Sequence, residues 1–243
     1  LSGQLMGCTA ENLVGEYNIS REEQDEFALE SHEKATNANE SGVFEDEIIS
    51  VELKSRKGEI EYFNKDETPR YGISIDKLSK LRPVFEKEGS VTAGNSCCQG
   101  DAGSALVISS KERADELGIK PLASILGYAS AGVDPKLMGL GPVEAIPMAL
   151  NKAKLKLDDM DLIEVNEAFA AQVIACEREL KWDRSKLNVR GGAIALGHPV
   201  GATGGKILAT CISALQKMGK EHAVVSACIG GGQGIALVIK CIG

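Results

Sequence analysis

Short apolar segments that alternate with helical segments from Ser104 onward constrain the fold of this chain more than any other feature. Segments rich in valine, isoleucine, leucine and alanine predict strands at residues 105–108, 123–128, 162–165, 223–227 and 235–239. The segments between them predict helices at residues 110–117, 142–154, 168–180 and 204–218. This alternation is typical of a layered α/β domain.

The first hundred residues have a different character. Ser20 is followed three residues later by Glu23, which is a capping-box signature, and the spacing of Phe27 and later alanines predicts a helix over residues 21–39. The apolar residues within 47–53 predict a strand. The polar stretch after it, up to Arg82, is interrupted by glycines and prolines, which indicates a loop-rich region.

The overall charge narrows the class of function. The 243-residue chain has a formal net charge of -8, whereas a general nucleic-acid binder needs a basic surface. A local basic pocket for one phosphate-bearing ligand remains compatible with this charge. The sequence has no apolar run of about 18 residues, the length that crosses a bilayer, and residues 1–15 lack the pattern of a secretory signal. We therefore expect a cytoplasmic protein that binds neither nucleic acid nor a membrane.

The pattern of cysteines also fits a cytoplasmic protein. The seven cysteines are irregularly spaced, and none forms a Cys-x-x-Cys pair, so neither a zinc site nor another metal site is expected. An odd number of free thiols fits a reducing compartment.

Three reactive side chains in the last third of the chain lie in turns of small residues. Asn166 begins Asn-Glu-Ala-Phe-Ala, His198 follows a glycine-rich turn and precedes Pro199, and Cys228 precedes a run of glycines. An amide, an imidazole and a thiol are the groups that thiol-based carbonyl chemistry needs. Glycines beside them let backbone N–H groups approach a substrate.

Each motif also has a plainer explanation. Asn166 alone could equally be a helix cap, and packing is the expected role of Cys176 and Cys211. Function is favoured for His198, because the other two histidines lie in ordinary charged segments. The glycines near His198 match neither a Walker loop, since Gly205-Lys206 is followed by isoleucine, nor a dinucleotide fingerprint.

Together the motifs resemble those of the thiolase family, the acetyl-CoA C-acyltransferases. The resemblance runs from about Leu5 to the C-terminus and includes further segments. These are Met6-Gly7-Cys8-Thr9-Ala10-Glu11-Asn12, Ser20-Arg21-Glu22-Glu23-Gln24-Asp25, Lys80-Leu81-Arg82-Pro83, Thr92-Ala93-Gly94-Asn95 and Asp134-Pro135-Lys136-Leu137-Met138-Gly139.

The resemblance implies a particular layered α/β fold. Thiolases have two similar α/β halves and a loop-rich domain inserted in the first half. By this likeness, residues 1–99 are the loop domain, residues 100–120 hold the last strand and helix of the N-terminal half, and residues 121–243 form the complete C-terminal half. Most of the N-terminal half is then missing, and the strand at 105–108 has lost its sheet.

The resemblance also implies catalytic roles. Cys228 matches the cysteine that removes or returns a proton at the α-carbon of acetyl-CoA. His198 matches the histidine that activates the nucleophile and donates to a thioester oxygen. Asn166 matches the residue that positions a water in that oxyanion hole, and Gly230 matches the backbone donor of a second one. The family's acyl-carrying cysteine has no counterpart in this sequence.

Coenzyme A contacts carry over in the same way. Arg70 resembles the basic residue near the adenosine phosphates, and Phe85 and Ala93 resemble adenine- and pantetheine-side contacts. The apolar wall along the pantetheine arm corresponds to Met138, Ala168 and Phe169. The chain departs from the family where Leu5 replaces a histidine, where Cys97 replaces a serine that contacts pantetheine, and where Cys98 replaces a glycine.

Three functions follow as hypotheses. The first is a thiolase-type acyltransferase of lipid metabolism that uses coenzyme A thioesters as substrates, without a covalently bound cofactor, and that is inactive as this isolated chain. The second is a non-catalytic coenzyme A-binding or complementing subunit of a split thiolase. The third is a hydrolase with a Cys228–His198 dyad. The expected partner is acyl-CoA, together with a homo-oligomer or a separate chain that supplies the N-terminal half.

Overall fold

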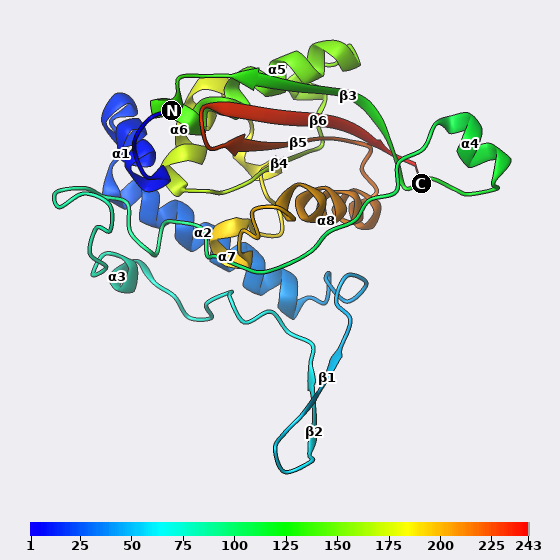
Figure 1. The fold of residues 1–243 in the computed structure, drawn as a ribbon, viewed down its shortest axis with the longest axis horizontal. Helices are drawn as coiled ribbons and strands as arrows, with labels where there is room; N and C mark the ends of the chain where they lie inside the picture. Colours follow the sequence, from blue (N-terminus) through cyan, green and yellow to red (C-terminus); the bar gives the residue numbers. More distant parts are fainter. Residues whose placement is uncertain (243) are drawn as a thin grey trace.

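The computed structural model describes residues 1–242 and has a four-stranded mixed sheet at its centre (Figure 1). The strand order is β3-β6-β5-β4. The strands are β3 (Ala123–Gly132), β4 (Leu162–Val165), β5 (His222–Ile229) and β6 (Gln233–Cys241). β6 pairs antiparallel with both β3 and β5, whereas β4 and β5 are parallel.

Helices cover both faces of this sheet, because successive side chains of each strand point to opposite faces. On one face, Ile163, Val165 and Val224 join a core with helices α5 (Gly141–Ala153) and α6 (Ala170–Leu180). On the other face, Leu162 and Ala223 pack against α8 (Thr203–Met218). The result is the layered arrangement that the alternating sequence predicts.

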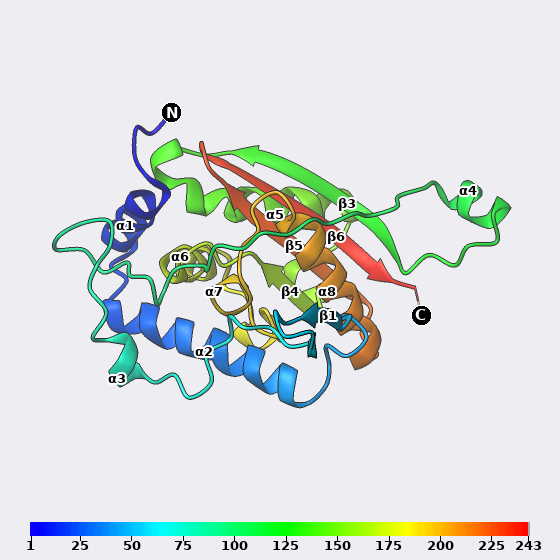
Figure 2. The same ribbon diagram turned by 60° about the horizontal axis from the view of Figure 1, so that its bottom comes forward.

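Two N-terminal helices pack beside these layers (Figure 2). α1 (Met6–Tyr17) has no counterpart among the sequence-based predictions. α2 (Arg21–Glu40) confirms the predicted helix and its capping box, because Glu23 N donates to Ser20 Oγ at 3.0 Å and Ser20 N donates to the Glu23 carboxylate at 2.7 Å. α2 contacts both α6 and α7 (Ala193–Leu196), so it supports the loops that follow β4.

A two-stranded hairpin projects from this body (Figure 1). Its strands are β1 (Val51–Lys54) and β2 (Ile60–Phe63), and every residue in them is exposed. The predicted strand over residues 47–53 is therefore wrong in its first half, since residues 48–50 precede the ladder and only Val51 onward finds a partner. The loop-rich prediction for the following stretch is confirmed apart from β2 and the short helix α3 (Ile75–Leu78).

The predicted strand at residues 105–108 is also wrong. Residues 101–110 form neither helix nor strand and are exposed. A strand requires a neighbour to complete its hydrogen bonds, and none of the described strands lies beside this segment. The predicted helix after it is confirmed as α4 (Lys111–Glu116), which Ser110 caps by accepting from Arg113 N at 3.2 Å.

The remaining predictions are confirmed to within a few residues, except that β3 continues to Gly132 and β6 to Cys241. The other described elements are short 3-10 helices, η1 (Pro135–Leu140), η2 (Leu157–Asp159) and η3 (Arg184–Lys186). Within residues 1–242, no helix is both long and apolar enough to cross a membrane.

Candidate active site

Asn166 and Cys228 lie at the same edge of the sheet. Asn166 directly follows β4, and its backbone N–H donates to Ser226 O at 2.9 Å. Ser226 lies two residues before Cys228 on the parallel strand β5. Because parallel strands end at a common edge, the β4–β5 register brings the loop after β4 close to the thiol.

His198 reaches this edge from the turn after α7. Gly197 ends that helix with φ +85°, a conformation that a residue with a side chain rarely adopts. His198 N then donates to Cys98 O at 2.7 Å. The imidazole Nε2 lies 3.4 Å from Asn166 Nδ2, so two of the three reactive groups are in contact.

Thr203 fixes the tautomer of the His198 ring. Thr203 Oγ1 lies 2.7 Å from His198 Nδ1 and donates its own proton to Pro199 O at 2.9 Å. The hydroxyl can therefore only accept from the ring, which places the proton on Nδ1 and leaves a lone pair on Nε2. Sequence reasoning missed Thr203, although its position at the start of α8, five residues after the histidine, was available as a signal.

The electrostatics keep both reactive groups neutral. Burial, and then the ammonium of Lys206, lower the pKa of His198 below its ordinary value. Burial raises the pKa of the Cys228 thiol to about 12, and the neighbouring Cys97 thiol adds to that shift. At neutral pH the site therefore holds a thiol and an uncharged imidazole.

Asn166 has spare hydrogen-bonding capacity inside the site. The residue is 1% exposed, and its Oδ1 has no hydrogen-bond partner among residues 1–242. A buried amide oxygen without a partner costs free energy, on the order of 1–3 kcal/mol. A polar ligand or a water at this position would offset that cost.

An apolar wall adjoins the thiol. Cys228 packs against a buried cluster that includes Met138, Ala168 and Phe169, and Phe85 meets Phe169 edge to face with ring centroids 6.0 Å apart. The structure thus brings together four of the predicted coenzyme A contacts. Two others lie outside this cluster and are exposed, namely Arg70 and Ala93.

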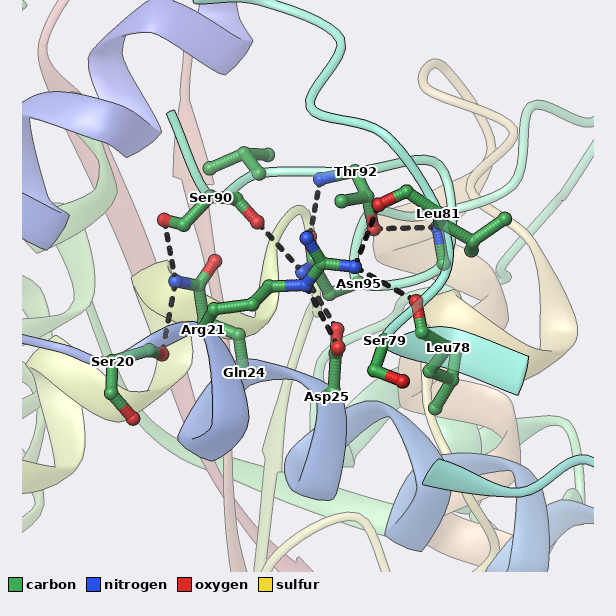
Figure 3. Close-up of polar contacts among 12 residues, drawn as sticks. Ser20, Arg21, Gln24, Asp25, Leu78, Ser79, Leu81, Ser90, Thr92 and Asn95 are labelled. Carbon is green, nitrogen blue, oxygen red and sulfur yellow. Dashed lines mark hydrogen bonds and ion pairs between the residues drawn. The ribbon is translucent and has the colours of Figure 1, made fainter. Parts of the chain in front are cut away.

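Cys97 adjoins the same wall, since its N–H donates to Ala168 O at 3.0 Å. A buried network on α2 holds this segment (Figure 3). Asn95 Nδ2 donates to Asp25 Oδ1 and to Ser90 O, both at 3.1 Å. Arg21 pairs with Asp25 at 2.8 Å. The loop that carries Cys97 is therefore positioned by a helix distant from it in sequence.

Glu167 and Gly192 form a second support that sequence reasoning missed. The buried Glu167 carboxylate accepts from Ser31 Oγ at 2.7 Å, from Asn188 Nδ2 at 2.9 Å and from Ile194 N at 3.1 Å. A Cβ at Gly192 would collide with this carboxylate, so a glycine is needed there. Burial raises the pKa of Glu167.

The glycines after Cys228 form the turn between β5 and β6. Gly231 and Gly232 have φ of +95° and +88°, and Val133 N donates to Gly232 O at 2.8 Å. Gly230 is exposed, and a Cβ there would lie 3.1 Å from Met6 Sδ. Across the described part of the chain, no group of three or more histidine, cysteine, aspartate or glutamate side chains is arranged to hold a metal ion.

Comparison with known proteins agrees with this architecture. The family described as "Thiolase, N-terminal domain" matches residues 1–112, and "Thiolase, C-terminal domain" matches residues 119–241. The chain is 51% identical to an acetyl-CoA acetyltransferase of Syntrophomonas wolfei, over 99% of this chain and 61% of that relative. The chain therefore belongs to the thiolase family.

Solved structures show the same fold. The acetyl-CoA acetyltransferase of Bacillus anthracis superposes with a TM-score of 0.93 at 51% identity, over 98% of this chain and 60% of that one. Human mitochondrial 3-ketoacyl-CoA thiolase in complex with CoA gives a TM-score of 0.89 at 46% identity, over 98% of this chain and 59% of that one. The chain thus spans about three-fifths of the length of these relatives.

Proposed function

We propose that this chain binds acyl-CoA thioesters and carries the proton-transfer site of a thiolase-type acyltransferase, whose reaction joins two acetyl-CoA molecules or cleaves acetoacetyl-CoA. The observation that carries this proposal is the Asn166–His198 contact of 3.4 Å, at the sheet edge where Cys228 lies one residue before the end of β5. Cytoplasmic lipid metabolism is the expected setting.

Proton transfer is the step that these residues can perform. In the proposed step the thiolate form of Cys228, a minor population at neutral pH because burial raises the thiol pKa, takes a proton from the α-carbon of an acetyl thioester. The electron pair of that C–H bond forms the C=C bond of the enolate, and the π pair of the carbonyl group moves to its oxygen. The enolate oxygen then needs donors, which we assign to a water held by Asn166 and to His198 once it is protonated at Nε2. The backbone N–H of Gly230 is assigned to the second oxyanion hole.

The ligand is proposed from the wall beside the thiol. Met138, Ala168 and Phe169 offer an apolar surface for a pantetheine arm, and Phe85 extends it. Arg70 would meet the phosphates of coenzyme A, Ala93 its adenine or pantetheine side, and Cys97 its pantetheine. The human relative with bound CoA supports this class of ligand.

We further propose three functional units. Residues 1–99 form the loop domain that holds coenzyme A, residues 100–120 belong with an N-terminal half, and residues 121–243 carry the catalytic groups. The last of these units ends at Gly243, which lies outside the described residues.

Two measurements test the function separately. The chain incubated with acetyl-CoA in D₂O is expected to exchange the acetyl protons, faster at higher pH because the thiolate is the base, and Cys228→Ala is expected to abolish the exchange. Cys241→Ala is the matched control, because Cys241 packs in the α8 cluster. The chain alone is expected to form no acetoacetyl-CoA, since the acyl-carrying cysteine lacks a counterpart. Exchange that survives Cys228→Ala would refute the assignment of the base, and condensation by the chain alone would refute its inactivity.

A specific observation also favours a second function, that of a complementing subunit. Leu106, Val107 and Ile108 are 47%, 100% and 72% exposed, which is unusual for three consecutive apolar residues. A sheet supplied by another chain would cover them and provide the missing hydrogen bonds. Mixing the chain with the segment of the Bacillus anthracis relative that has no counterpart here is expected to restore condensation. Val107→Asp is expected to prevent this, and restoration unaffected by that substitution would argue against docking at this segment.

A further inference from the structure

The short helix α7, which presents His198, is held at both ends by charged side chains from other elements. At its N-terminal end, Ile194 N donates to the Glu167 carboxylate at 3.1 Å. At its C-terminal end, Lys206 Nζ donates to Leu196 O at 3.3 Å and to Gly197 O at 2.9 Å. An acidic group at the start of a helix and a basic group at its end both complement the helix dipole.

Lys206 lies on the first turn of α8, is half-buried and adjoins the candidate site. Its ammonium holds the two carbonyl groups that immediately precede His198. It also lines a cavity of about 10 Å³ with Glu164, Asn166 and Gly192, which is about the smallest volume that holds one water. The lysine therefore contacts the backbone of the histidine turn and shares a cavity with the amide that touches the imidazole.

Three acidic groups lie near Lys206, and two of them are buried. Glu164 on β4 is buried, and burial followed by repulsion from Glu167 raises its pKa to about 8. Burial also raises the pKa of Glu167. The third acidic neighbour, Asp66, is exposed. Burial lowers the pKa of Lys206, and the charges of these three acidic groups oppose that shift.

We propose that Lys206 is a positioning residue for His198. Its ammonium holds the Gly197 turn that presents the imidazole through the carbonyl groups of Leu196 and Gly197, and its charge adds to the effect of burial in favouring the neutral ring. The importance of Lys206 for catalysis rests on the proposed function, but its contacts with the turn before His198 are present in the chain without substrate.

Three variants separate the two effects. Lys206→Met removes both the charge and the donor, Lys206→Gln keeps an amide donor without the charge, and Lys206→Arg keeps both. Lys217→Met is the matched control, because Lys217 is also on α8 and also donates to a backbone carbonyl, Val43 O, at 2.9 Å. All variants are first compared with the parent by circular dichroism.

The first readout is the titration of the His198 ring, followed by NMR of the chain labelled in its three histidines and assigned with His198→Gln. The pKa of His198 is expected to rise in Lys206→Met and Lys206→Gln, because the neighbouring positive charge lowers it in the parent. Lys206→Arg is expected to restore the parent value, and Lys217→Met to leave it unchanged. If Lys206 acted on His198 only through packing, arginine and glutamine would restore the pKa of His198 to similar extents. Restoration by arginine and not by glutamine therefore indicates an effect of charge.

The second readout is hydrogen exchange at the amides of Gly197 and His198, which donate to Ala193 O and Cys98 O. Exchange is expected to accelerate about tenfold in Lys206→Met and to stay near the parent rate in Lys206→Arg. An unchanged His198 titration in both neutral variants would overturn the electrostatic role. Unchanged exchange in Lys206→Met would overturn the positional role. If Lys206→Met does not fold, Lys206→Gln still decides the electrostatic role, and Lys206→Ala, which also removes the donor, replaces Lys206→Met in the comparison with Lys206→Arg that decides the positional role. Neither result depends on whether acetyl-CoA is a substrate.

Discussion

Acidification is expected to destabilise the folded chain through one buried histidine, His32 on α2. The residue is 2% exposed, and its Nδ1 accepts a hydrogen bond from Arg70 N at 3.2 Å. An imidazole that accepts at Nδ1 must lose this bond when that nitrogen is protonated. Burial, and then the positive charge of Arg70, lower the pKa of His32 from 6.5 to about 4.

The sign and the size of the effect follow from linkage. The folded state favours the neutral ring, so the stability that this preference provides is complete above the unfolded pKa of 6.5. That stability is lost as the pH falls towards the folded pKa of about 4. The difference of about 2.5 pKa units, at about 1.4 kcal/mol each, amounts to roughly 3 kcal/mol of unfolding free energy.

Urea denaturation at several pH values between about 7.5 and about 4 measures this loss. His32→Gln, whose amide oxygen can accept from the same N–H without titrating, is expected to lack this part of the pH dependence. Arg70→Ala keeps the backbone donor but removes the charge, so it is expected to raise the pKa of His32 and to reduce the loss. If the parent and His32→Gln lose stability equally over this range, His32 is not the group responsible.

Three further outcomes are expected. Burial raises the pKa of Cys228 from 9.0 to about 12, so its alkylation at neutral pH is expected to be a few tens of times slower than that of a free thiol. Peptide mapping after treatment with iodoacetamide measures this rate. A rapid reaction would contradict the burial of this thiol. Gly192→Ala places a Cβ against the Glu167 carboxylate and is expected to cost about 2 kcal/mol or more of unfolding free energy, whereas Gly204→Ala, with open space around it, is the control. Ser20→Ala removes the capping box of α2 and is expected to cost about 1 kcal/mol in urea denaturation, with a loss near zero contradicting the cap.

Local sequence signals predicted the core of the fold well. β4 was predictable as a short apolar run, α2 from its capping box of Ser20 and Glu23, and α6 and α8 from the helical spacing of their apolar residues. The segment at residues 105–108 has the composition of a strand but lacks a neighbour, so its local pattern misleads. α1 was missed because Leu5 at its N-cap makes no side-chain hydrogen bond, so the usual start signal is absent.

The sequence singled out the proposed reactive groups of the candidate site, whose roles stay predictions, but not the residues that contact them. Glycine-rich turns marked His198 and Cys228 because close approach of the backbone needs glycine. Glu167, Thr203 and Lys206 act through contacts formed only when three elements meet, and each has an ordinary appearance in the sequence. His32 illustrates the same limit, since its charged helical neighbours gave no sign that the ring is buried.

The pKa shifts at the site also separate two of the chemical hypotheses. A Cys–His hydrolase dyad works as a thiolate beside an imidazolium, which requires a lowered cysteine pKa and a raised histidine pKa. Here burial raises the pKa of Cys228 and lowers that of His198, and the charge of Lys206 opposes an imidazolium further. His198 is moreover oriented by the neutral hydroxyl of Thr203 rather than by a carboxylate that would stabilise a positive ring. The proposed proton exchange needs only a small population of the Cys228 thiolate, which is why its rate is expected to rise with pH, whereas the dyad needs the thiolate–imidazolium pair as its resting state.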